Sequence, residues 1–127
     1  MGKYKDVFDS ELFINEPVLT ADYVHVYDNG GGGTSQTYHL IQVSSVGTEA
    51  IDIVIEGSNQ VDENKGLVAW SVICTKQLSV DAEPSVAAIT EAGLYRVATT
   101  TRFTRLRVVS LTGTFALTMV GRYLTAS

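Results

Sequence analysis

Short runs of β-branched and aromatic residues, alternating with polar ones, constrain the fold of this chain more than any other feature. The run "EAIDIVIEG" at residues 49–57 alternates most regularly. Ile51, Ile53 and Ile55 face one side of an extended backbone and the residues between them face the other, because successive strand side chains point to opposite faces. This period of two predicts a half-buried strand.

Similar runs recur at intervals of about a dozen residues, separated by Gly, Asn, Asp and Ser. The last two runs are joined by "LTG", which is typical of a short hairpin turn. About eight strands in 127 residues predict an all-β fold, an antiparallel β-sandwich of jelly-roll-like form. The expected strands are residues 18–27, 36–46, 49–57, 67–75, 86–89, 94–100, 102–110 and 114–124.

The first seventeen residues differ from the rest. The stretch "YKDVFDSELFINEP" places Phe8, Leu12, Phe13 and Ile14 among acidic residues, ahead of Pro17. An apolar terminal segment needs something to cover it. It is either an extended arm laid on a neighbouring subunit or an edge segment packed on its own domain. We therefore divide the chain into an N-terminal arm or edge segment, residues 1–17, and a single β-sandwich domain, residues 18–127.

Charge is distributed unevenly along the chain. The formal net charge is −5, which argues against nucleic-acid or anionic-membrane partners. Residues 1–64 carry 11 acidic and 2 basic side chains, whereas residues 65–127 carry 3 acidic and 7 basic side chains. Copies of the chain could associate head to tail if the fold keeps the halves apart. No window approaches 18 uninterrupted apolar residues, so we expect no membrane-spanning segment.

Several sequence features that resemble ligand sites lack an essential part. The glycines at residues 30–33 are followed by neither the lysine nor the helix that a nucleotide site needs. The acidic run at residues 61–66 does not fit a calcium loop, and the two histidines, at positions 25 and 39, lack further metal ligands nearby in sequence. We expect no cofactor, no metal and no enzymatic activity. Cys74, in the apolar run "AWSVICT", is expected to be a buried, inert thiol.

Two groups of residues are candidates for binding. Arg105 and Arg107 alternate with apolar residues, so both lie on one strand face; Arg102 precedes them and Arg96 lies on a nearby strand. Arginine favours protein interfaces, where its planar fork pairs with carboxylates.

Tyr23 and Tyr27 have the spacing of a sugar-stacking pair on one strand face. Tyrosine also serves simply to cover a half-buried sheet, so both interpretations of this pair stay open.

The stretch from Gly47 to Tyr123 contains "GTEAIDIVIEGSN", "AWSVI" and "AGLYRVATTTRFTRLRVVSLTGTFALTMVGR". In this pattern a strand ending in Gly-Ser-Asn precedes a Trp strand, followed by an Arg-x-Arg strand and a Thr-Gly-Thr turn. It resembles the jelly-roll proteins of tailed-phage virions, especially small capsid decoration (cementing) proteins.

This resemblance implies a structural protein of the capsid surface, made in the host cytoplasm, without active site or cofactor. The implied partners are the major capsid protein and further copies of the chain, as a dimer or trimer. Candidate contacts are Phe8, Leu12, Phe13, Ile14, Arg96, Arg102, Arg105 and Arg107. The alternative is a sugar-binding β-sandwich module of a head fibre or tail, with Tyr23 and Tyr27 as the stacking residues.

Overall fold

The computed structural model describes residues 10–28, 36–45, 50–59, 69–99 and 101–124, and these residues form strands, turns and bends without any helix. The strands are β1 (Ser10–Glu16), β2 (Val24–Asp28), β3 (Gln36–Ser45), β4 (Ala50–Ser58), β5 (Ser71–Val72), β6 (Thr75–Gln77), β7 (Ser85–Val86), β8 (Gly93–Thr99), β9 (Phe103–Thr112) and β10 (Phe115–Leu124). The predicted all-β class is confirmed.

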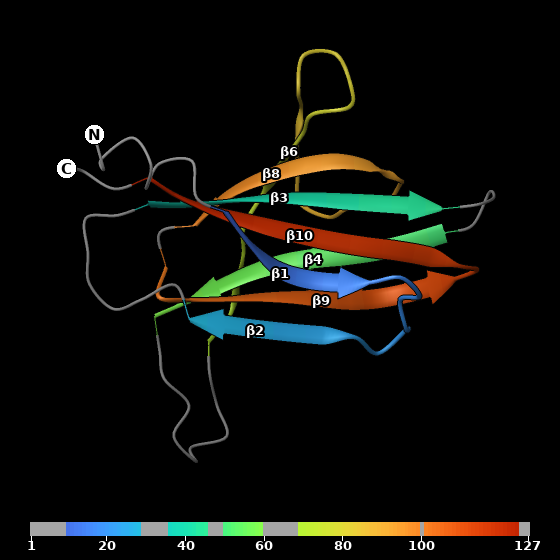
Figure 1. Cartoon of the computed structure of the whole chain (residues 1–127), viewed down its shortest axis with the longest axis horizontal. Helices are drawn as coiled ribbons and strands as arrows, with labels where there is room; N and C mark the ends of the chain where they lie inside the picture. Colours follow the sequence, from blue (N-terminus) through green and yellow to red (C-terminus); the bar gives the residue numbers. More distant parts are fainter. Residues whose placement is uncertain (1–9, 29–35, 46–49, 60–68, 100, 125–127) are drawn as a thin grey trace.

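The strands form two antiparallel sheets (Figure 1). One sheet has six strands in the order β1-β10-β3-β8-β6-β7, and the other has four in the order β2-β9-β4-β5. Their pairing describes one long hairpin, in which β1 pairs with β10, β2 with β9, β3 with β8 and β4 with β5. Folding this hairpin over itself adds the pairs β10–β3 and β9–β4. That is the strand order of a jelly roll.

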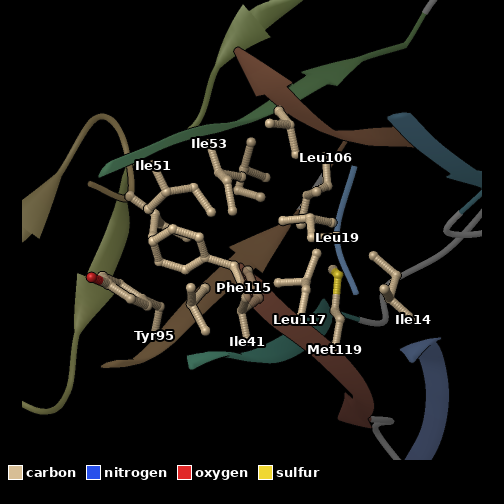
Figure 2. Packing of buried hydrophobic residues seen from close by; sticks show 14 of the residues in the cluster. Ile14, Leu19, Ile41, Ile51, Ile53, Tyr95, Leu106, Phe115, Leu117 and Met119 are labelled. Atoms are coloured by element: carbon tan, nitrogen blue, oxygen red, sulfur yellow. The ribbon is translucent and has the colours of Figure 1, made fainter. Parts of the chain in front are cut away.

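The core lies between the sheets. Figure 2 shows Phe115 and Leu117 of β10 among side chains from the opposite sheet, including Ile53 and Leu106. These side chains are buried because they occupy every second position of their strands. Full burial of each large aliphatic side chain stabilises the fold by about 1.5–3 kcal/mol.

The predicted strand at residues 67–75 was wrong as a single element. Its described part divides at Ile73 and Cys74, where the chain leaves the four-stranded sheet after β5 and enters the six-stranded sheet as β6. Ile73 packs against the core, while Cys74 is exposed. The expectation of a buried Cys74 was therefore also wrong: an apolar run that changes sheets does not bury every residue.

The expected strand at residues 18–27 begins only at Val24. The residues before it form a turn, in which Leu19 reaches into the core and its N–H donates to the carbonyl of Phe115 at 2.8 Å. This hydrogen bond attaches the segment between β1 and β2 to β10, at the point where the chain passes from one sheet to the other.

Candidate protein interface on the four-stranded sheet

The outer face of the four-stranded sheet gathers charged and aliphatic side chains in two rows. In one row Val26 of β2 lies opposite Arg105 of β9, which lies opposite Glu56 of β4, which lies opposite Val72 of β5. In the next row Val24, Arg107 and Val54 follow in the same order. We name this surface the Arg–Val face and define it by Val24, Val26, Glu56, Trp70, Val72, Arg105 and Arg107.

Glu56 is the centre of the Arg–Val face. Its Oε1 accepts hydrogen bonds from Nε of Arg105 at 3.0 Å and Nε of Arg107 at 3.2 Å, and Nη2 of Arg105 lies 2.9 Å away. The Glu56 side chain is only 8% exposed, although its strand position faces outward, because the two arginines cover it. One carboxylate between two guanidinium groups leaves a net charge of +1.

An aromatic ring fixes one of the two guanidinium groups. The Arg105 guanidinium lies over the Trp70 ring, 4.4 Å from its centroid, in a cation–π contact. Arg107 has only its Nε in a hydrogen bond to Glu56, and its side chain is 38% exposed. Within the described residues its two Nη groups make no hydrogen bond or ion pair, so they are donors that this face offers to a partner carboxylate.

Aliphatic side chains surround these charges. Val24, Val26 and Val72 are 48%, 50% and 52% exposed. Seven large hydrophobic residues are exposed in the described chain. Four of them lie on strands of the four-stranded sheet: these three valines and Val109. The strands of the six-stranded sheet contribute one, Leu94. Exposed apolar surface around arginine and tryptophan is typical of protein-binding sites.

The arginines grouped by sequence do not form one stripe. Arg96 lies on β8 in the six-stranded sheet, alternating with the buried Tyr95 and Val97, so its side chain is on the opposite outer surface from Arg105. The two sheets interleave strands that are distant in sequence, and local alternation does not show which sheet a strand joins. Arg102 is at the start of the β9 region, where it lies over the Phe103 ring at 5.1 Å and its N–H donates to Asn59.

Arg96 has a cationic neighbour on its own surface. Lys76 of β6 is its direct cross-strand partner, and both side chains are exposed. Among the described residues, neither takes part in an ion pair. Like charges directly opposite one another in a sheet are destabilising.

The N-terminal candidates divide between described and undescribed residues. Phe8 lies outside the described residues. Leu12, Phe13 and Ile14 belong to β1, which pairs with β10 at the edge of the six-stranded sheet, with a bulge between Leu12 and Ile14. Ile14 is buried in the core, so its side chain is not available to another subunit.

The tyrosine pair is only partly described. Tyr23 precedes β2 and packs partly against the core, and burial, with a smaller effect of Glu16, raises the pKa of its hydroxyl. The side chain of Tyr27 lies outside the described residues, as do the glycine run at 30–33 and the acidic run at 61–66. The sugar-stacking hypothesis stays a prediction.

In the described part of the chain, no group of three or more His, Cys, Asp or Glu side chains is arranged to hold a metal ion. The same part contains no helix with the length and apolarity that a membrane crossing requires.

The side chains that contact Arg105 could not be identified from the sequence. Glu56 and Trp70 are 49 and 35 positions from Arg105, so only the strand register brings them together. The alternation in "VHVYD" did contain a signal for Val24 and Val26, since it places both opposite the core-facing side.

The fold and this surface define a jelly-roll β-sandwich with an exposed face suited to protein contacts. No family model matches the chain, and no curated protein matches it. Among solved structures, the chain is similar to the SPBc2 prophage-derived protein YomS, with a TM-score of 0.61 and 15% sequence identity. The match covers 88% of this chain and 89% of that chain. At this identity the likeness shows a shared fold.

Proposed function

We propose that the chain is a non-enzymatic structural protein of a phage virion, which decorates or cements the capsid surface through contacts with the major capsid protein. The observation that carries this proposal is the fold shared with a prophage-derived protein over nearly the whole of both chains. The resemblance of the sequence between Gly47 and Tyr123 to jelly-roll proteins of tailed-phage virions also supports the proposal. On this proposal the chain is made in the host cytoplasm and ends on the virion.

A protein that cements a shell needs exposed surfaces that bind other proteins. The Arg–Val face is one such surface. A second is the exposed pair of Lys76 and Arg96 on the six-stranded sheet, where a carboxylate from the shell would relieve the repulsion between two adjacent cations. A further candidate contact is the segment of residues 1–9, which contains Phe8 and lies outside the described residues.

Sedimentation with capsid shells tests this function. Expanded shells that lack this protein, purified from the phage that encodes it, are mixed with increasing amounts of the chain and pelleted. The proposal predicts saturable binding to the shells and none to unassembled major capsid protein. Absence of binding to the shells, or equal binding to the unassembled protein, would overturn it.

Two variants locate the contact. Deletion of residues 1–9 leaves β1 and its pairing with β10 intact, so we expect it to weaken shell binding without changing the β-sheet circular dichroism signal. Arg96→Glu is expected to weaken shell binding as well, because it reverses the charge of the exposed cationic pair. If both variants bind as the parent does, these surfaces are not the contact.

A further inference from the structure

The connection between β6 and β7 projects from the sandwich. In Figure 1 it is the yellow loop that rises above β8, whereas β2 lies along the opposite margin of the molecule. Residues 79–85 are all exposed, and Val80 is among the exposed large hydrophobic residues. We name residues 78–84, between the two strands, the projecting hairpin.

The projecting hairpin has a defined backbone. The N–H of Glu83 donates to the carbonyl of Val80 at 3.1 Å, and the N–H of Gln77 donates to the carbonyl of Pro84 at 2.9 Å. Ala82 and Glu83 have φ angles of 69° and 43°, in the left-handed region that residues with a Cβ adopt at a cost. The hydrogen bond from Glu83 to Val80 and the positive φ of Ala82 are those of a tight turn, which holds the tip of the hairpin in one shape.

The hairpin is acidic in a basic half of the chain. Asp81 and Glu83 are two of the three acidic residues between positions 65 and 127. Within the described chain, no ion pair involves either carboxylate. Two carboxylates beside an exposed valine are therefore exposed to solvent, and no basic side chain of the described residues forms an ion pair with them.

The Arg–Val face is complementary to this hairpin. The face combines a net charge of +1, the Nη donors of Arg107 and exposed valines, and the hairpin combines two carboxylates with Val80. An association of face against face would oppose like charges. We propose that the projecting hairpin of one copy docks on the Arg–Val face of a second copy, in a heterologous, head-to-tail contact.

The expected contact is small. A hairpin tip covers less than the roughly 800 Å² per partner of a standard interface, so the association is weak and depends on concentration. Copies bound side by side on a shell would be held at a high effective concentration, where a weak contact suffices. The proposal itself does not depend on the shell, because it concerns purified protein.

Sedimentation equilibrium of the full chain tests the contact. The parent is expected to self-associate as its concentration rises from the micromolar to the millimolar range. Arg107→Glu on the face and the double change Asp81→Lys, Glu83→Lys on the hairpin are each expected to lower the association constant at least tenfold. The control Gln42→Glu adds a negative charge at an exposed position of β3, on the outer surface of the six-stranded sheet, and should leave the association constant unchanged.

Mixing the two disrupted variants gives the sharpest result. Each keeps one intact half of the head-to-tail contact, so the equimolar mixture should form a 1:1 heterodimer while each variant alone stays monomeric. If Arg107→Glu fails to fold by circular dichroism, Val26→Thr with Val72→Thr replaces it and should weaken association several-fold. A monomeric parent at every concentration, an effect of Gln42→Glu equal to that of the face variant, or a mixture that stays monomeric would overturn the proposal.

The experiments can refute the hairpin contact and the proposed function separately. A protein that binds shells but stays monomeric would refute the hairpin contact and leave the decoration role standing. A protein that self-associates through these residues but does not bind shells would refute the decoration role and leave the hairpin contact standing.

Discussion

At the scale of single residues, Glu56 shows how one side chain organises a surface. Its carboxylate holds Arg105 and Arg107 together although their positive charges repel, and Trp70, just before β5, supports Arg105 through its ring. The arginines cover the carboxylate in return, and the hydrogen bonds to charged groups in this partly buried setting each contribute more than an exposed pair would.

Glu56→Gln is therefore expected to destabilise the fold. The change removes the negative charge and leaves two guanidinium groups side by side, so we expect a loss of about 2 kcal/mol in the free energy of unfolding. Urea denaturation at pH 7 measures it. The matched control Arg96→Gln, on an exposed side chain, should change stability by less than about 0.5 kcal/mol. Equal effects of the two changes would contradict the role given to Glu56.

His39 makes the free energy of unfolding depend on pH. Burial lowers the pKa of His39 to about 4, whereas the unfolded chain titrates near the ordinary value of 6.5. Between these values the unfolded state binds the proton and the folded state does not. The His39 contribution is therefore fully present above pH 6.5 and is lost as the pH falls toward 4. The difference between the two pKa values corresponds to about 3 kcal/mol in the free energy of unfolding.

Urea denaturation at several pH values between 6.5 and 5 measures how the free energy of unfolding changes with pH. Most carboxylates remain ionised in that window, so the slope of the free energy of unfolding against pH depends mainly on histidine. We expect His39→Asn to flatten the slope, and His25→Asn to change it less, because His25 is only half-buried. An unchanged slope in the His39 variant would show that the residue is solvated or protonated in the folded protein.

Alternation along the chain is sufficient to predict that Arg105 and Arg107 share a face opposite Leu106. It does not predict their carboxylate partner, since Glu56 meets Arg105 only through the register of β4 on β9. Register depends on the packing of all the inward side chains together. For the same reason, the sequence could not show that Arg96 belongs to the other surface.

At the scale of elements, the segment between β5 and β6 packs closely against Gly57. A Cβ at this position would lie 2.5 Å from Oγ1 of Thr101 and 2.7 Å from Cδ1 of Ile73. The space beside the glycine is thus filled by Ile73, the residue at which the chain leaves the four-stranded sheet. A local sequence pattern does not reveal this close approach, which explains why residues 67–75 were predicted as one strand.

Gly57→Ala is expected to destabilise the protein by about 1–3 kcal/mol, because Ile73 and Thr101 must move to admit the methyl group. Thermal or urea denaturation measures the loss. Ser71, the cross-strand neighbour of Gly57, is exposed, so Ser71→Ala is the control and should be nearly neutral. A neutral Gly57→Ala variant would mean that the crossing segment is loosely packed.

At the scale of the whole molecule, the unequal charge of the two halves does not separate them in space. Each described strand of the first half, β1 to β4, pairs with strands of the second half. The jelly-roll hairpin imposes this interleaving, because its two arms come from opposite halves of the chain. Charge is instead arranged locally: the Glu56–arginine cluster lies on the four-stranded sheet, and the acidic hairpin projects from β6 and β7 at the edge of the six-stranded sheet.

The proposed place of this protein is the surface of a phage virion. Quantitative mass spectrometry of purified particles of that phage tests this proposal most directly. The account predicts that peptides of this chain are present in a fixed ratio to the major capsid protein, and that mild denaturant releases the chain before the shell disassembles. Purified, infectious particles that contain none of these peptides would contradict it.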